Sequence, residues 1–198
     1  MRGYVKIFMP LMVAWLLFFP SHGAAAKEYL GFSPGNQSLD EVVLTLKTAG
    51  AVFDQNYGYQ GYVKNLPVIK VNSYKKFNRF GKVKEAWLWF TPDRKLYRIT
   101  VTWGEGDKIF KLLKDALDTK YGQPTIPGGA FQNMGFHKQF KYQDQDIEIL
   151  LKLNEFGFEP DVTLIYTYTP GTPAFENEKK RIEADIKLRN AQKAGSDL

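Results

Sequence analysis

The chain has 198 residues and no cysteine, 44% of its residues are hydrophobic, and its formal net charge is +6. A chain of this size buries enough apolar surface to fold without covalent cross-links, and its 15 Phe, 11 Tyr and 4 Trp favour an aromatic core. The composition excludes thiol nucleophiles, cysteine-ligated metal sites and disulfide-based scaffolds.

The N-terminus has the pattern of an export signal. Arg2 and Lys6 precede an uncharged apolar run over residues 7–19, and small residues follow it. This pattern predicts a signal peptide of residues 1–26, too short to span a bilayer comfortably. Loss of Arg2 and Lys6 lowers the basic count from 27 to 25 against 21 acidic residues, so the mature charge is +4. We therefore expect a periplasmic or secreted protein over residues 27–198, with a mild preference for anionic partners.

The first elements of the mature chain have clear local signals. Ser38 followed by Glu41 forms a capping box, which predicts a helix that ends at Gly50. Residues 52–63 and 67–77 are rich in Tyr and Val and predict two strands joined by a turn.

Residues 83–103 predict the central hairpin of the sheet. Pro92 and the aspartate after it are typical of a tight turn. On the return strand Tyr97 begins an apolar alternation that runs to residue 103 and predicts a half-buried strand. The outgoing strand is apolar on both faces, so either both faces are covered or Trp87 and Trp89 line a groove.

The second half repeats the order of helix and then strands. An amphipathic pattern predicts a helix over residues 107–121, followed by a long loop over residues 123–134. Three strands are expected over residues 136–142, 147–153 and 162–169.

Residues 173–198 form a charged segment that predicts a C-terminal helix or tail, solvated and stabilised by i,i+4 ion pairs. Phe175, Ile182 and Ile186 are expected to dock its near end, and fraying is expected beyond Arg189.

These elements predict an α+β fold in which helices back an antiparallel sheet in a two-layer arrangement. We expect residues 27–172 to form one domain. Residues 39–103 and 107–169 have similar length and element order, which hints at a duplicated α-β-β-β unit. In layout alone the chain resembles secreted two-layer proteins such as the β-lactamase inhibitory proteins; no shared motif carries individual residues over.

The sequence contains no catalytic motif that we can identify. His137 is the one histidine of the mature chain, and no serine lies in a G-x-S-x-G setting. Asp144, Asp146 and Glu148 have a spacing that could hold Ca²⁺, but a polar hairpin tip explains them more simply. We therefore assign no catalytic residue, metal ligand or cofactor, and lean against an enzyme. A hydrolase that acts through two carboxylates stays open, because such pairs have no fixed spacing.

Two segments predict binding. Residues 74–84 hold five basic residues and three aromatic ones without an acid. Such a tip could engage phosphates, anionic lipid or an acidic glycan, and so permits peripheral membrane contact. It could equally be a solvated loop whose rings enter the core. The export signal argues against nucleic acid as the ligand. The candidate residues of this basic segment are Lys75, Lys76, Arg79 and Lys82.

The second binding signal is aromatic. Tyr57 and Tyr59 share one strand face, as do Trp87 and Trp89, and flat rings on a sheet are a common platform for sugars or partner proteins. An ordinary core that covers both faces of the sheet is the alternative.

Three functional classes follow from the sequence. We favour an exported, non-enzymatic binding or protein-interaction module of the cell envelope, with an envelope protein or an anionic envelope component as partner. The alternatives are a carrier of a small lipid or glycan and the carboxylate-dependent hydrolase. The oligomeric state stays open at this stage.

Overall fold

The computed structural model describes residues 27–125, 137–155 and 159–196. The predicted signal peptide and most of the predicted loop over residues 123–134 lie outside these residues.

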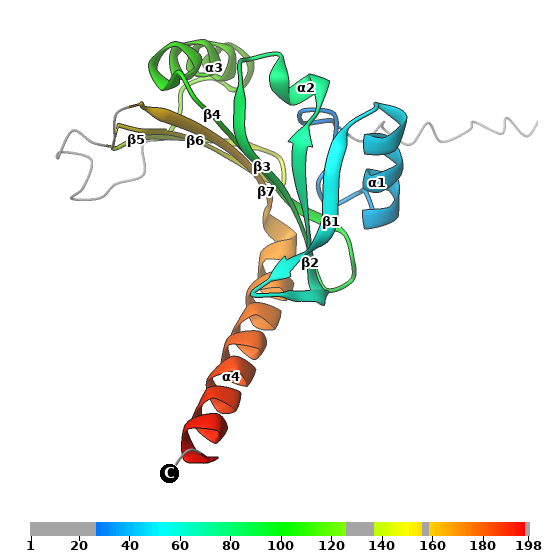
Figure 1. Ribbon diagram of the computed structural model, residues 1–198. Helices are drawn as coiled ribbons and strands as arrows, with labels where there is room; N and C mark the ends of the chain where they lie inside the picture. The colour runs from blue at the N-terminus through cyan, green and yellow to red at the C-terminus, as the bar shows by residue number, and fades with distance from the viewer. Residues whose placement is uncertain (1–26, 126–136, 156–158, 197–198) are drawn as a thin grey trace, which may run out of the picture.

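The fold is α+β, as predicted, and is built on one seven-stranded antiparallel sheet with the strand order β1-β2-β3-β4-β7-β6-β5 (Figure 1). The strands are β1 Val52–Tyr59, β2 Tyr62–Ser73, β3 Val83–Phe90, β4 Leu96–Trp103, β5 His137–Asp144, β6 Ile147–Asn154 and β7 Asp161–Tyr168. The helical elements are α1 Leu39–Thr48, α2 Lys75–Asn78, α3 Gly106–Tyr121, η2 Thr169–Gly171 and α4 Thr172–Ser196.

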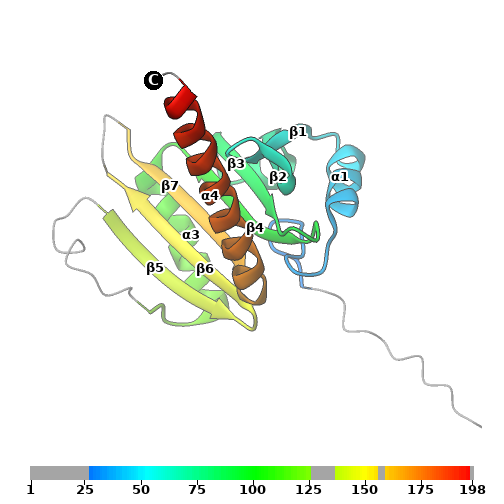
Figure 2. The same cartoon turned by 90° about the horizontal axis from the view of Figure 1, so that it is seen from below.

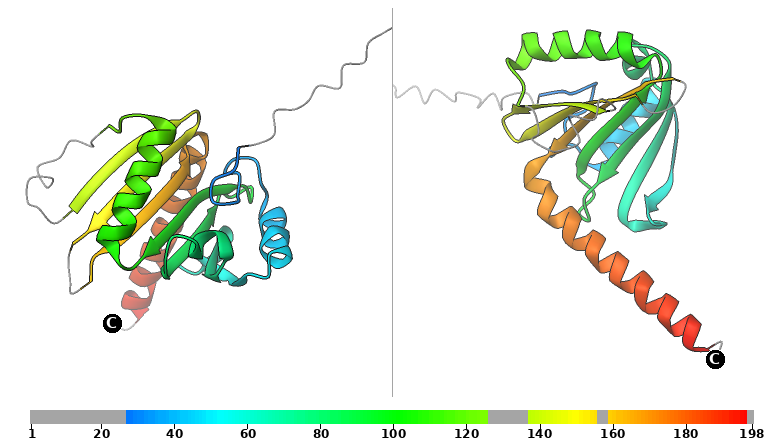
Figure 3. Two further views of the ribbon diagram at one scale, coloured as in Figure 1. Left: turned by 90° about the horizontal axis from the view of Figure 1, so that it is seen from above. Right: turned by 90° about the vertical axis from the view of Figure 1, so that its left-hand side faces the viewer.

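The main core lies on one face of the sheet, under α1 and α3. The predicted capping box starts α1, since the Ser38 side chain accepts from the Glu41 N–H and the Glu41 carboxylate accepts from the Ser38 N–H. Apolar residues of α3 at helical spacing, such as Ile109 and Leu113, enter the same core as Leu88 of β3. Figure 3 shows α3 lying across the sheet on this side. The two long predicted helices of the domain are therefore confirmed.

The opposite face carries α4. A second, smaller core joins Leu66 and Tyr97 of the sheet to Phe175 and Ile182 of α4, with Ile186 packed against it. The docking predicted for the near end of this helix is thus confirmed. A two-layer arrangement is not, because helices lie on both faces of the sheet, as Figure 2 shows.

The helix α4 continues well beyond its docked turns. It has 25 residues, which corresponds to a length of about 37 Å, and remains helical to Ser196. The prediction of fraying after Arg189 is therefore wrong, although residues 187–194 are exposed. Figure 3 shows the far end of α4 projecting away from the sheet. Among the described helices, none combines the length and the apolar character needed to cross a membrane.

The hairpin between β1 and β2 differs from the prediction. Its turn lies at Gln60 and Gly61, both with positive φ, and not near residues 65–67. Pro67 lies inside β2 without breaking it, because a register irregularity faces it in β1 and the ladder to β3 begins only at Val68. The predicted end of this strand is also wrong, because Phe77 belongs to the short helix α2.

The central hairpin is confirmed, with one change of face. The turn after β3 closes through a bond of 2.9 Å from the Arg94 N–H to the Thr91 carbonyl. At its base Trp89 pairs with Arg98 and Phe90 with Leu96, which leaves Tyr97 as an extra residue in β4. This bulge turns Tyr97 to the α4 side of the sheet and away from the main core, contrary to the predicted alternation.

Candidate functional site

The four aromatic residues singled out in the sequence come together in one groove on the α4 side of the sheet. Tyr57 and Tyr59 of β1 and Trp87 and Trp89 of β3 line a depression of about 300 Å³. We call it the aromatic groove. Val68 forms part of its floor, because this β2 residue pairs with Tyr57 on one side and with Trp89 on the other.

Three rings of the groove contact one another, and these contacts extend to α4. Tyr57 meets Trp87 at 5.3 Å between ring centroids and 87° between planes, and Trp87 lies 6.4 Å from Trp89. Trp89 then meets Phe175 of α4 at 6.4 Å. Phe175 in turn stacks on Tyr97 at 4.6 Å, so the bulge in β4 supplies the ring on which α4 rests.

The tryptophans are neither fully buried nor fully exposed. Trp87 and Trp89 are half-buried, and Tyr57 is 39% exposed. The ammonium group of Lys70 lies 5.4 Å from the centroid of a Trp87 ring, a cation–π distance. Of the two arrangements that the sequence allowed, the structure has the groove, which the two half-buried tryptophans line.

The helix α4 lies beside the groove, where Phe175 meets Trp89, and is held by tyrosine and amide donors from the β1–β2 hairpin. The Tyr59 hydroxyl donates to Glu183 at 2.5 Å and the Tyr62 hydroxyl to Asp185 at 2.7 Å. The bond to Glu183, followed by burial, raises the pKa of Tyr59, so this hydroxyl stays a donor at neutral pH. The Asn65 side chain donates to Glu178 at 2.8 Å. Sequence reasoning missed these contacts because charge spacing within a helix carries no information about partners on another element.

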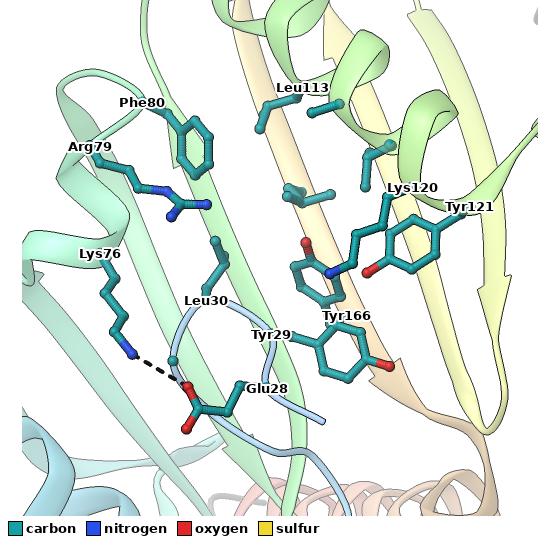
Figure 4. Close-up of a pocket in the computed structure, with 14 residues that line it drawn as sticks. Glu28, Tyr29, Leu30, Lys76, Arg79, Phe80, Leu113, Lys120, Tyr121 and Tyr166 are labelled. Atoms are coloured by element: carbon teal, nitrogen blue, oxygen red, sulfur yellow. Dashed lines mark hydrogen bonds and ion pairs between the residues drawn. The ribbon is translucent and has the colours of Figure 1, made fainter. Parts of the chain in front are cut away.

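The basic segment does not form one continuous tip. Its aromatic residues Tyr74 and Phe77 are buried, as the alternative interpretation of this segment predicted. Lys76 and Arg79 border a pocket under α3 (Figure 4), whereas Lys82 borders a separate depression with Lys84. Lys75 is exposed and borders a further depression near the end of α1.

Two of the three acids suggested for Ca²⁺ point to different partners. Asp144 forms an ion pair with Lys27 at 2.6 Å and accepts from the Tyr29 hydroxyl at 2.7 Å. Glu148 pairs with Lys141 at 2.5 Å. Within the described residues no group of three or more His, Asp or Glu side chains is arranged to hold a metal ion. The backbone of His137 pairs with Asn154 at the start of β5.

Two carboxylates do share one depression. Glu105 and Glu159 border the same depression as Lys82 and Lys84, and both glutamates are exposed. The Lys84 ammonium lies 3.8 Å from Glu159 and 2.5 Å from Asp161. Both glutamates of this site are therefore solvent-exposed and lie beside two lysines.

The chain matches no family model, no curated protein and no solved structure. The resemblance in layout to the β-lactamase inhibitory proteins therefore has no support from these comparisons. What the molecule defines is an α+β protein with a seven-stranded antiparallel sheet and an aromatic groove beside a projecting helix.

Proposed function

We propose that the protein is an exported, non-enzymatic binding module that holds a protein of the cell envelope in the aromatic groove. The observation that carries this proposal is the convergence of Tyr57, Tyr59, Trp87 and Trp89 in one half-open site. Tyr and Trp are enriched among the residues that dominate binding energy at protein interfaces, because they bury a large area at a low entropic cost.

The surroundings of the groove also favour a protein partner. Beside it the sheet presents three uncharged, half-buried residues, Thr100, Thr102 and Ile165. The centres of protein interfaces are similarly depleted in charge. The exposed turns of α4 add Leu188, which is 58% exposed, at the far side. A partner that fills the groove would therefore meet the sheet and a helix, a surface broader than a small molecule needs.

Site-specific photo-cross-linking tests this proposal. A benzophenone amino acid replaces Tyr57 in the groove or, as a control, Leu44, which is 64% exposed on α1 over the opposite face. The mature chain is then irradiated in envelope extract. We expect a discrete protein adduct from position 57 and none at the same mass from position 44. Adding Trp87→Ala should remove the adduct, because the anchor ring is lost.

Two results would contradict the proposal. One is the same set of adducts from both positions, which indicates non-specific contact. The other is an adduct from position 57 that survives Trp87→Ala in a variant whose circular dichroism is unchanged. If the groove binds a glycan and no protein, the partner is instead a glycan or another anionic component of the envelope. N-terminal sequencing of the protein from a periplasmic fraction tests export, and we expect Lys27 as the first residue.

At the level of fold, we also propose that the two halves are copies of one α-β-β-β unit. The first copy would comprise α1 with β2, β3 and β4, and the second α3 with β5, β6 and β7. In support, the last strands of the two units, β4 and β7, pair with each other inside the sheet. On this assignment β1 is an added edge strand. A rotation that superposes the Cα atoms of both sets of elements would support the duplication, and mismatched strand directions would contradict it.

A further inference from the structure

A pocket lies on the face of the sheet opposite the aromatic groove. Residues 28–31, the end of α2, one side of α3 and β7 enclose about 290 Å³. Figure 4 shows these four segments around the space. The volume is at the lower end of the range for small-molecule sites. Because the sheet separates the pocket from the groove, this site is independent of the function proposed above.

The floor of the pocket is apolar. Leu113 and Leu117 of α3 and Leu164 of β7 belong to the main core and also line this space. Leu30 and Phe80 extend the apolar lining toward the entrance. Such a lining favours a ligand with an apolar body, since burial of that body removes hydrocarbon from water.

The entrance carries positive charge from separate elements. Lys76 and Arg79 come from α2 and the residue after it, and Lys120 from the end of α3. Glu28 is the carboxylate that lines the entrance, and it lies 3.4 Å from the Lys76 ammonium. Outside the lining, Asp144 interacts electrostatically with Lys120 but is paired with Lys27. Neither Arg79 nor Lys120 forms an ion pair with any residue that the structure describes; each lies over an aromatic ring instead. The entrance therefore has an excess of cations with unused donors.

One hydroxyl that faces the pocket has no hydrogen-bond partner among the residues that the structure describes. Tyr166 is 6% exposed, and its hydroxyl forms no hydrogen bond within residues 27–125, 137–155 and 159–196. Figure 4 shows this hydroxyl directed into the pocket and not toward Tyr29. The centroids of the Tyr29 and Tyr166 rings are 5.0 Å apart. Burial raises the pKa of Tyr166, so the hydroxyl carries its proton at neutral pH. The hydroxyl oxygen itself is not fully buried, so it is open to the pocket and can donate to the acceptor of a ligand there.

The turn that borders the entrance is held in a strained conformation. Leu30 has a φ of +53° and Gly31 a φ of +93°, and the Tyr29 and Phe32 backbones exchange hydrogen bonds across them. A Cβ atom on Gly31 would lie 2.5 Å from Cδ of Lys76, so the lysine stem rests directly on this turn. A bulky residue with positive φ is costly and persists where the surroundings impose it, which occurs often at binding sites.

We infer that this pocket binds a small organic anion, a single carboxylate or phosphate head on a short apolar body. The head would lie among Arg79, Lys120 and the Tyr166 hydroxyl, and the body would rest on the leucine floor. A guanidinium group and a neutral hydroxyl both donate to anionic oxygens, and such charge-assisted bonds are the strong ones. The pocket is too small for an intact two-chain lipid, so the ligand is a free small molecule.

Isothermal titration calorimetry on the mature chain with octanoate tests this inference. Three comparison probes separate its parts: 1-octanol has the body without the charge, inorganic phosphate has the charge without the body, and phosphatidylglycerol vesicles present the head on a membrane. We expect saturable binding of octanoate with one site per chain, at least about tenfold tighter than 1-octanol or phosphate, because body and head each contribute.

Variants then assign the binding to the pocket. Arg79→Gln and Lys120→Gln should each weaken octanoate binding about tenfold, and Tyr166→Phe by a few-fold, as expected for loss of one donor to an anion. The matched control Lys111→Gln changes an exposed lysine of α3 that does not line the pocket, and should leave the affinity unchanged. Trp87→Ala should also leave it unchanged, which distinguishes this site from the aromatic groove. Circular dichroism and a melting curve confirm that each variant is folded.

Several results would overturn the inference. Equal affinity for 1-octanol would reduce the site to an apolar patch, and equal affinity for phosphate would reduce it to a charged surface. Binding to vesicles alone would make it a membrane contact. If Lys111→Gln lowers the affinity for octanoate as much as Lys120→Gln does, binding depends only on the net charge of the protein.

Discussion

Three buried tyrosines of the main core differ in what their hydroxyls contact, and this difference predicts opposite effects of the same substitution. Tyr142 is 3% exposed and donates to Asp118 at 2.7 Å. Tyr142→Phe deletes this bond to a charged group, but Asp118 keeps its bond of 2.5 Å from Lys114. We therefore expect the free energy of unfolding to fall by about 1.5 to 2 kcal/mol, the lower part of the range for such bonds. Tyr29→Phe should behave similarly, because Asp144 retains Lys27.

Tyr166→Phe is the matched change without a partner to lose. Its hydroxyl has no hydrogen bond among the described residues, so the phenyl ring should be tolerated and the free energy of unfolding should stay constant or rise by up to about 1 kcal/mol. In a domain of this size each kcal/mol shifts the melting temperature by about 2 to 4 °C. The two variants should therefore differ by about 3 to 12 °C.

Urea unfolding followed by tryptophan fluorescence measures this difference at pH 7, with circular dichroism as a second probe of two-state behaviour. Equal m-values are required before the free energies are compared. A loss of stability in Tyr166→Phe as large as that in Tyr142→Phe would refute the reasoning, because it would show that the Tyr166 hydroxyl has a partner in the free protein. It would also remove one support for the anion site.

Two further predictions concern α4 and acid stability. Phe175→Ala deletes a side chain that is 4% exposed and stacked on Tyr97, so the free energy of unfolding should fall by about 3 kcal/mol. The variant should also make α4 a target of limited proteolysis. Protection equal to that of the parent protein would show that other contacts dock the helix. Burial of Asp144 opposes its ionisation, but Lys27 and Tyr29 lower its pKa below the usual value. The ionised carboxylate therefore stabilises the fold above about pH 4, and this contribution is lost as the pH falls through the lowered pKa. Asp144→Asn should flatten the acid limb of a plot of stability against pH, and an unchanged slope would contradict this.

The predictions from sequence succeeded where a few neighbouring residues determine the structure. The capping box at Ser38 acts over three positions, and the turn at Pro92 depends on the φ of one residue. By the same criterion Gln60 and Gly61 are a turn signal, but the prediction gave more weight to Pro67 and placed the turn there. Proline breaks a strand only where its missing N–H is needed, and the sheet places Pro67 where it is not.

The face of Tyr97 could not have been predicted locally. Its position depends on the register in which Trp89 meets Arg98 and Phe90 meets Leu96, and a one-residue shift moves a side chain to the other face. This shift determines how α4 docks, because it places the Tyr97 ring on the face of the sheet where Phe175 stacks on it. A strict period of two would have placed Tyr97 in the main core and left Phe175 without its stacking partner.

The aromatic groove could be anticipated because the period of two along β1 and β3 already puts each pair of rings on one face. What the sequence lacked was the intervening strand: β2 lies between β1 and β3, and its Val68 brings Tyr57 and Trp89 into one cross-strand row. The pocket is different, since Arg79 and Lys120 meet only through packing of α2 and α3 on the same sheet. In the sequence Arg79 belonged to a basic segment and Lys120 to the polar face of a helix.

The two sites lie on opposite faces of one sheet, which makes each a control for the other. A residue in β3 that points into the groove, such as Trp87, alternates with Leu88, which points into the main core beneath α3. A variant at Trp87 that also weakened octanoate binding would indicate a change in the sheet itself, because no side chain is shared by the two linings. Loss of one binding activity with retention of the other, in both directions, is therefore the pattern that two independent sites require.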